Sequence, residues 1–315
     1  MLSRRMPRGY PHADPGFGLT HSPPRPLHRH PLTWILASLL AIGVVTLALT
    51  MSGGANGEAR ADATSAADSS PVSAAVSAPV RSPNATLSEG TGTLNVVALG
   101  DSVPSGSACH CTPFPDLVAS RLATLTGRRV VDTNLAVGGL DSCELLDQLD
   151  TAATRSALRG ANVVLIEIGA NDFDEGLADD PPCARPDDDA CEGATLRTVT
   201  AHLATIVDRV RVLQQPSDAQ IVLMGYWNVF RDGQVGQARG PAYVAWSAQI
   251  TDLTNAAIAK IANEKHVRYA DAYTPFKGRS GLDPTDLLAA DGNHPNATGH
   301  EKLASAVVTA LGLGG

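Results

Sequence analysis

Residues 94–313 alternate short apolar runs with longer amphipathic stretches, a pattern that only a few folds can accommodate. The run NVVLIEIG at 162–169 is the clearest strand, because it is too continuously apolar to leave one face in water. The other strand candidates are 94–100, 130–137, 220–226 and 266–270, and the helical stretches are 115–125, 144–158, 194–213, 241–264 and 296–311. Strands that alternate with helices predict an α/β fold, a three-layer, doubly wound and mainly parallel sheet of five strands with right-handed crossovers.

The residues before this module begin with a charged segment and an apolar one. Residues 1–31 carry five arginines against the single acidic residue Asp14, and we interpret them as a basic cytoplasmic tail. Residues 32–51 contain no charge, and a helix of this length spans a hydrocarbon core of about 30 Å. We therefore expect an uncleaved transmembrane signal-anchor, with a cleaved signal peptide as the alternative because Ala59-Arg60-Ala61 fits a cleavage site. The preceding arginines predict that the rest of the chain is exported.

Composition separates a linker from the folded module. Residues 52–93 are mostly Ala, Ser, Gly, Thr and Pro without an aromatic residue, which predicts a flexible linker. Residues 94–315 are then one domain, since about 220 residues can enclose a single core. The whole chain carries 24 Lys and Arg against 32 Asp and Glu, a net charge of −8, and this balance argues against a nucleic-acid-binding protein.

Polar motifs follow the predicted strands, at the edge where parallel sheets place their active sites. They are GDSV at 100–103, NLAVGG at 134–139 and GAND at 169–172, and DGNHP at 291–295 lies near the C-terminus. In this order the four motifs resemble those of the SGNH (GDSL-type) esterase and lipase superfamily, over residues 94–313. The resemblance implies the flavodoxin-like SGNH hydrolase fold and a serine hydrolase of carboxylic esters that uses no cofactor.

The residue types in these motifs suit nucleophilic catalysis. A serine hydroxyl needs an adjacent base, which makes Ser102 the candidate nucleophile and His294 the candidate base. Asp291 lies three residues before His294, so one turn can present both, and its carboxylate would orient the imidazole. By resemblance, the oxyanion hole consists of the backbone N–H groups of Ser102 and Gly139 and the side-chain amide of Asn171, with Gly138 as the alternative to Gly139.

Several of these residues also have plainer interpretations. Ser102 could be only a helix N-cap, and Asn171 could cap the segment that follows it. We interpret Asp172 as a supporting hydrogen-bond partner. His300 is expected to be a solvated residue of the last helix, and His202 and His266 are expected to be ordinary helix and loop residues.

The five cysteines fit an exported protein. Cys183 and Cys191 bracket the loop CARPDDDAC and predict a disulfide in an oxidising compartment. The resemblance implies a second disulfide between the first two site loops, from Cys143 to Cys111, or alternatively to Cys109. Cys109-His110-Cys111 lacks standard zinc spacing and the acidic loop at 172–192 lacks a calcium-binding pattern, so we expect no metal.

The sequence therefore predicts an acyl-ester hydrolase that acts outside the membrane through an acyl-enzyme intermediate. Its substrate would be a small-molecule, lipid or glycan ester, and its catalytic domain is expected to be monomeric. The alternative is a cell-envelope glycan O-acyltransferase or deacetylase with the same catalytic residues. A catalytically silent glycan-binding module is a further hypothesis, which the intact set of catalytic residues disfavours.

Overall fold

The computed structural model describes residues 87, 91–180, 183, 185–214 and 219–314. The predicted tail, the apolar run at 32–51 and most of the predicted linker lie outside these residues, so their assignments stay predictions. Among the helices of the described part, none is long and apolar enough to cross a membrane.

The described residues form one five-stranded sheet in which every pairing is parallel, in the order β2-β1-β3-β4-β5. The strands are β1 (Leu94–Gly100), β2 (Val130–Asn134), β3 (Val163–Glu167), β4 (Gln220–Met224) and β5 (Arg268–Ala270). This order places the first strand inside the sheet and returns the chain past it to β3, as in flavodoxin-like folds. The predicted fold class is confirmed.

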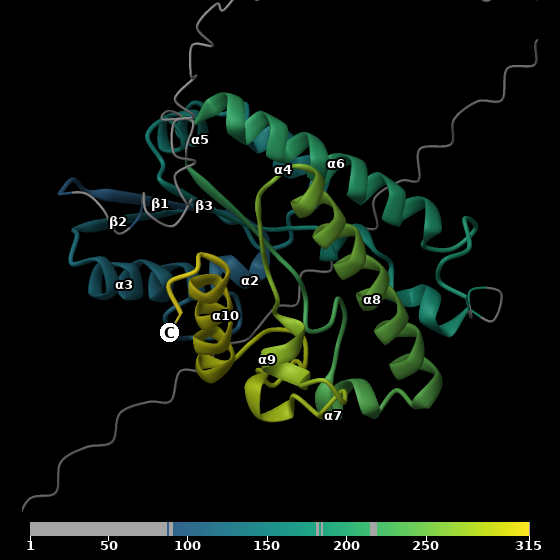
Figure 1. Cartoon of the computed structure of the whole chain (residues 1–315). Helices are drawn as coiled ribbons and strands as arrows, with labels where there is room; N and C mark the ends of the chain where they lie inside the picture. Colours follow the sequence, from purple (N-terminus) through teal and green to yellow (C-terminus); the bar gives the residue numbers. More distant parts are fainter. Residues whose placement is uncertain (1–86, 88–90, 181–182, 184, 215–218, 315) are drawn as a thin grey trace, which may run out of the picture. The chain divides into compact units, whose positions relative to one another are not determined.

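Helices cover both faces of the sheet (Figure 1). The longer ones are α3 (Phe114–Thr126), α4 (Ser142–Gln148), α5 (Ala152–Leu158), α6 (Gly193–Leu213), α8 (Pro241–Glu264) and α10 (Ala297–Ala310). The shorter ones are α2 (Ser102–Ser105), α7 (Gly233–Gln237) and α9 (Tyr273–Lys277), with the 3₁₀ turns η1 (Ala170–Asp172), η2 (Glu175–Asp179) and η4 (Thr285–Leu287). Helices α4, α5, α6 and α8 pack on one face, and α3, α9 and α10 pack on the other.

The central strand β3 explains why its sequence is apolar throughout. Val164 and Ile166 pack in the core beneath α6 and α8, whereas Val163 and Leu165 pack in the core beneath α3 and α10. Alternate residues of a strand face opposite sides of a sheet, so a strand covered on both sides needs apolar residues at successive positions. The sheet thus lies between two layers of helices, with its central strand buried on both faces.

Two of the differences between the structure and the predicted elements have a clear cause in the hydrogen bonds. The helical stretch at 144–158 is two helices, α4 and α5, because Thr151 caps a new helix by accepting a hydrogen bond from the Thr154 N–H at 3.2 Å. Strand β2 ends at Asn134 rather than at residue 137, since the Asn134 side chain accepts from the Ala136 N–H and donates to the Pro104 carbonyl. That second bond ties the end of β2 to the loop after β1.

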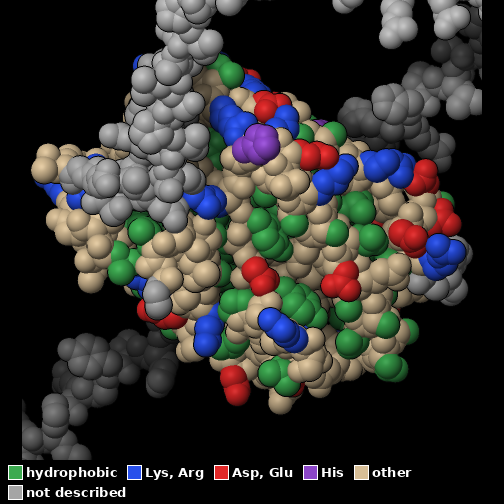
Figure 2. All heavy atoms as spheres, in the orientation of Figure 1, with side chains coloured by type: hydrophobic (Ala, Val, Ile, Leu, Met, Phe, Trp, Pro, Cys, Tyr) green, Lys and Arg blue, Asp and Glu red, His purple; other side chains and the backbone are tan. Residues whose placement is uncertain are grey.

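Charged side chains of both signs lie on the surface of the described residues. On the face drawn in Figure 2, acidic and basic side chains are scattered, and no extended basic patch gathers over the described elements.

Candidate active site

Ser102 stands at the carboxyl end of β1, on a turn that its neighbours fix. Gly100 has a φ of +138°, and a Cβ at this position would lie 2.0 Å from the Glu167 carbonyl oxygen, so the turn requires glycine. Asp101 caps α2 by accepting a hydrogen bond from the Val103 N–H at 3.2 Å. The N-cap of α2 is therefore Asp101, which leaves the Ser102 hydroxyl for another role.

Asp291 and His294 form a hydrogen-bonded pair near the C-terminus. Nδ1 of His294 lies 2.6 Å from Oδ2 of Asp291, and Oδ1 of Asp291 accepts from the N–H groups of Asn293 and His294. Partial burial raises the pKa of Asp291, but these backbone bonds and the His294 side chain outweigh it and hold the pKa below its ordinary value. The carboxylate is thus ionised at neutral pH and can orient the imidazole.

One pocket of about 200 Å³ brings three of the predicted residues together: its lining includes Ser102, Asn171 and His294. Nε2 of His294 is buried and has no hydrogen-bond partner among the described residues. Because Asp291 holds Nδ1, Nε2 is the ring nitrogen that can exchange a proton in this pocket. The arrangement fits a nucleophile, a base and an amide donor that face a common substrate.

The amide of Asn171 is anchored beside the glycine loop. Its Nδ2 donates to the Leu140 carbonyl at 2.9 Å, which leaves a second N–H for a ligand. A Cβ on Gly138 would lie 4.0 Å from the Ser102 Cβ, whereas Gly139 has a φ of +85° and open space around it. Neither glycine is among the residues that line the pocket, so both stay candidates for the backbone donor.

Asp172 supports this loop, as the sequence analysis expects. It accepts hydrogen bonds from the Ser142 N–H at 2.9 Å and the Ser142 hydroxyl at 2.5 Å, and burial raises its pKa. Nδ1 of His202 lies 2.8 Å from the Ser142 hydroxyl. The interpretation of His202 as an ordinary helix residue does not predict this contact. Together these bonds fix the start of α4 against η1.

A family comparison decides the identity of the domain. The model of the GDSL-like lipase/acylhydrolase family matches residues 98–302, about two thirds of the chain. The chain belongs to this family. The predicted enzyme class, a GDSL-type hydrolase of ester bonds, is therefore confirmed.

Solved structures agree with this assignment at the level of the fold. The lipase Lip_vut3 from a goat rumen metagenome is 18% identical, with a TM-score of 0.54 over 69% of this chain and 97% of its own. Axe2, an acetylxylan esterase from Geobacillus stearothermophilus, is 20% identical, with a TM-score of 0.50 over 71% of this chain and 96% of its own. None of the curated proteins matches the sequence.

Beside Ser102, the GDSL-like domain holds buried acidic groups to which the sequence alone assigns no role. Asp101 and Glu167 are each 1% exposed, and Tyr226 is 2% exposed. Burial raises the pKa of Asp101 to about 7, and burial together with the charge of Asp101 raises the pKa of Glu167 well above its ordinary value. A signal was present in the sequence, since Glu167 is the single charged residue of an otherwise apolar strand.

This burial predicts a pH-dependent stability that depends on Glu167. Above its ordinary pKa of about 4.5, Glu167 ionises in the unfolded chain but keeps its proton in the folded domain. The folded state then binds one more proton, so the free energy of unfolding falls as pH rises, by up to about 1.4 kcal/mol per pH unit. Glu167→Gln should remove the contribution of Glu167 to this slope, while that of Asp101 remains, and so gain stability relative to the wild type between pH 5 and pH 7.

Urea denaturation at the two pH values measures the slope. Glu264→Gln, at the exposed end of α8, is the control and should leave the slope unchanged. Equal slopes for the wild type and Glu167→Gln would show that Glu167 ionises alike in both states.

The disulfides follow the prediction in one case and not in the other. Cys183 and Cys191 are bonded, as predicted. The predicted Cys111–Cys143 bond is wrong: Cys111 is bonded to Cys109, and Cys143 is a free, exposed residue of α4. The reason lies in the intervening His110, whose φ of 50° folds the loop back and brings the Cα atoms of Cys109 and Cys111 to 5.1 Å.

The expectation that His300 is solvated is also wrong. His300 is 0% exposed, because α10 packs against α3 and buries the imidazole beside Phe114. Its Nδ1 accepts a hydrogen bond from the Phe114 N–H at 3.2 Å, at the first residue of α3. His300 thus joins the two helices and belongs to the core.

Proposed function

We propose that this domain hydrolyses acyl esters through an acyl-enzyme intermediate on Ser102. The observation that carries the proposal is the single pocket that Ser102, Asn171 and His294 share, with His294 held by Asp291 at 2.6 Å. A nucleophile, a base with its orienting carboxylate and a preorganised amide donor are the parts that acyl transfer requires.

The steps follow from these positions. The Ser102 hydroxyl attacks the ester carbonyl while Nε2 of His294 takes its proton, and the charge that develops on the carbonyl oxygen accepts hydrogen bonds from Asn171 and the backbone donors. Collapse of the tetrahedral intermediate releases the alcohol, which receives the proton from His294. Water then attacks the acyl-enzyme carbonyl and gives its proton to Nε2 of His294. The ester bond to Ser102 breaks, the carboxylic acid leaves, and Ser102 recovers its proton from His294.

The pocket dimensions favour a short acyl group. A volume of about 200 Å³ is below the range of about 300–1,000 Å³ that holds drug-sized ligands. Phe173, Trp227 and Phe230 line it, and stacking of Phe230 on Trp246 and of Trp227 on Phe276 fixes two of these rings from behind. A pocket with such walls accepts an acetyl or butyryl group and resists expansion for a long chain.

A panel of p-nitrophenyl esters, assayed on the purified chain, tests the substrate class. We expect kcat/KM to be highest for acetate or butyrate and to fall by at least about tenfold for octanoate, since a chain that overfills the pocket cannot place its carbonyl beside Ser102. Phe173→Ala should move the optimum to longer chains. A wild-type optimum at laurate would contradict the proposed pocket.

We favour hydrolysis over the alternative of a glycan O-acyltransferase, because no observation on the described residues supports the transferase. The two differ in the acceptor of the acyl group. Oligosaccharide acceptors added to the same panel distinguish the two. With a transferase, the acceptor would raise the rate of alcohol release, and an acylated sugar would form.

We also propose that the domain lies outside the membrane, anchored by residues 32–51. The support is the uncharged run of twenty residues after an arginine-rich segment. Protease added to intact cells should release an active fragment that begins within residues 52–93. Full-length protein in the cytosolic fraction would contradict this placement, and a mature chain that begins near Ala61 would indicate cleavage instead.

A further inference from the structure

A disulfide lies in the loop that leaves the nucleophile helix. Cys109 and Cys111 are bonded within residues 106–113, between α2 and α3, and both are half-buried. On either side of Cys109, Ala108 has a φ of 58° and His110 a φ of 50°, a backbone region that residues with a side chain rarely adopt. By contrast, Cys183 and Cys191 are buried at 3% and 9% exposure.

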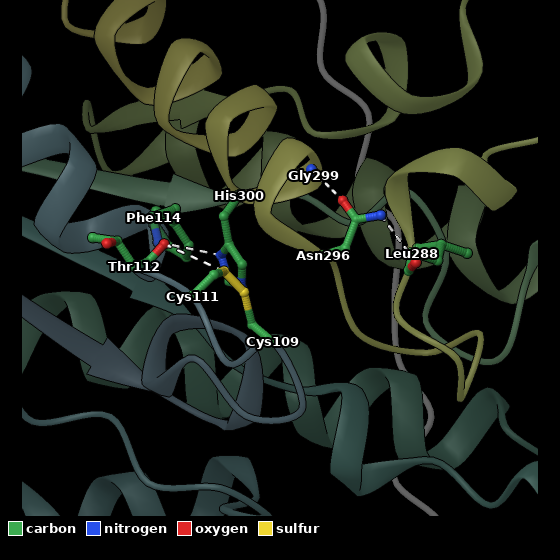
Figure 3. Close-up of a disulfide and its surroundings, with 8 residues drawn as sticks. All are labelled: Cys109, Cys111, Thr112, Phe114, Leu288, Asn296, Gly299 and His300. Carbon is green, nitrogen blue, oxygen red and sulfur yellow. Dashed lines mark hydrogen bonds between the residues drawn. A yellow bond between two sulfur atoms is a disulfide. The ribbon is translucent and has the colours of Figure 1, made fainter.

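The buried imidazole of His300 faces this disulfide. A ring nitrogen of His300 and the two sulfur atoms all lie within 4.8 Å of one another, and Figure 3 shows the ring beside the sulfur pair. Nε2 of His300 is buried and has no hydrogen-bond partner among the residues that the structure describes. A buried polar atom without a hydrogen-bond partner costs free energy. We therefore expect Nε2 of His300 to gain a partner in another state of the protein.

The hydrogen bond at the other ring nitrogen defines what Nε2 can do. Because Nδ1 accepts the Phe114 N–H, the ring proton resides on Nε2. Burial, and then the nearby His294, lower the pKa of His300 to about 4, so the ring is neutral at physiological pH. Nε2 is thus an N–H donor on a ring that lies beside the two sulfur atoms, with no hydrogen-bond partner among the described residues while they are bonded to each other. This tautomer excludes Nε2 as a metal ligand, although two cysteines and a histidine would otherwise suit a soft metal ion.

We propose that Cys109 and Cys111 are a redox-active disulfide that exchanges with an external dithiol, and that the Nε2–H of His300 stabilises the thiolate which reduction releases. A disulfide sulfur is a weak acceptor, whereas a thiolate is a strong one, so the unpaired donor gains its partner only in the reduced state. Cys111 Sγ lies 3.6 Å from the Thr112 carbonyl oxygen, which accepts only from a protonated thiol. Cys111 therefore keeps its proton, and Cys109 is the thiolate.

The exchange balances as follows. A thiolate of the external dithiol attacks Cys111 Sγ, the bond between Cys109 and Cys111 breaks, and Cys109 leaves as the thiolate that His300 stabilises. The second thiol of the reagent, after losing its proton, attacks the mixed disulfide and releases Cys111 as a thiolate, which takes up that proton. The dithiol ends as a disulfide, and the protein has gained two electrons.

Redox titration of the purified full chain tests the proposal, with the Cys183–Cys191 bond as an internal control. The background variant Cys143→Ser removes the free thiol. The chain is equilibrated anaerobically with mixtures of reduced and oxidised dithiothreitol, and the thiols are alkylated and mapped. We expect Cys109–Cys111 to be the more easily reduced bond. At the ratio of reduced to oxidised dithiothreitol that reduces half of it, less than about a tenth of Cys183–Cys191 should be reduced. Simultaneous reduction of the two bonds, or reduction of Cys183–Cys191 first, would overturn the proposal.

Two variants of His300 isolate the hydrogen bond. His300→Phe keeps a ring without a donor and should shift the equilibrium toward the disulfide by about tenfold, the scale of a hydrogen bond to a charged group. His300→Gln retains both an acceptor for Phe114 and a donor, and should stay within about threefold of the wild type. An unchanged equilibrium in a folded His300→Phe protein would rule out the role of His300.

Two measurements on the reduced Cys143→Ser protein do not depend on the folding of a His300 variant. Its thiolate absorbance should titrate below the ordinary cysteine pKa of about 8.5, and an ordinary value would overturn the proposal. One equivalent of Zn²⁺ should leave the alkylation rate of Cys109 and Cys111 unchanged. Protection of both thiols by Zn²⁺ would assign a metal site in place of the exchange site.

Discussion

Ser102→Ala should lower kcat by about 10⁴–10⁶-fold, because it removes the atom on which the acyl-enzyme forms. His294→Ala should cost about as much, since a nucleophile and its base act as a unit and their losses are not additive. The double variant should therefore be no slower than either single one. Asp291→Asn should cost less, because the Asp291 side chain is 39% exposed and water can partly replace it beside the imidazole.

Ester turnover and labelling by a fluorophosphonate probe measure these losses independently. Ser107→Ala is the matched control, because Ser107 lies in the loop directly after α2 and its hydroxyl is hydrogen-bonded to that of Ser105 at 2.9 Å. It should keep activity within about fivefold of the wild type, while Ser102→Ala neither turns over nor labels. Residual labelling of Ser102→Ala with loss of labelling in Ser107→Ala would assign the nucleophile to Ser107.

The sequence predicts this fold well because its main determinant is local. Each strand is a short apolar run and each helix a longer amphipathic one, so the period of the apolar residues identifies the elements before any packing is known. The parallel sheet then brings the ends of β1 and β3 to one edge, which places Ser102 and Asn171 in the same pocket. The spacing of Asp291 and His294 within one turn is local in the same way.

What the sequence could not supply depends on packing between distant segments or on single backbone angles. The burial of His300 arises from the packing of α10 on α3, which are separated by most of the domain. The pairing of Cys109 with Cys111 depends on the positive φ of His110. No pattern in the sequence predicts this backbone angle. The raised pKa of Glu167 depends on the burial of its side chain and then on the charge of Asp101.

Asn171→Ala should lower kcat by about 10²–10³-fold, equivalent to about 2.7–4 kcal/mol of transition-state stabilisation. Leu140 occupies one amide N–H of Asn171. In the proposed mechanism the other bonds the oxygen on which negative charge develops, so this bond should be stronger in the transition state than with the bound ester. KM should therefore change little. The loss of the bond to Leu140 should appear separately, as a fall of about 1 kcal/mol in the free energy of unfolding.

Steady-state kinetics and urea denaturation of the same preparation separate the two effects. Asn293→Ala provides the matched control, because Asn293 lines the same pocket while its contact with Asp291 is made by the backbone N–H. That variant should stay within about fivefold of the wild type in kcat. Phosphonylation of Ser102 also builds up charge on an oxygen, so Asn171→Ala should slow probe labelling by a factor similar to its loss in kcat. A variant with normal kcat and raised KM would instead assign Asn171 to substrate binding, and the oxyanion would have to be stabilised by the backbone donors alone.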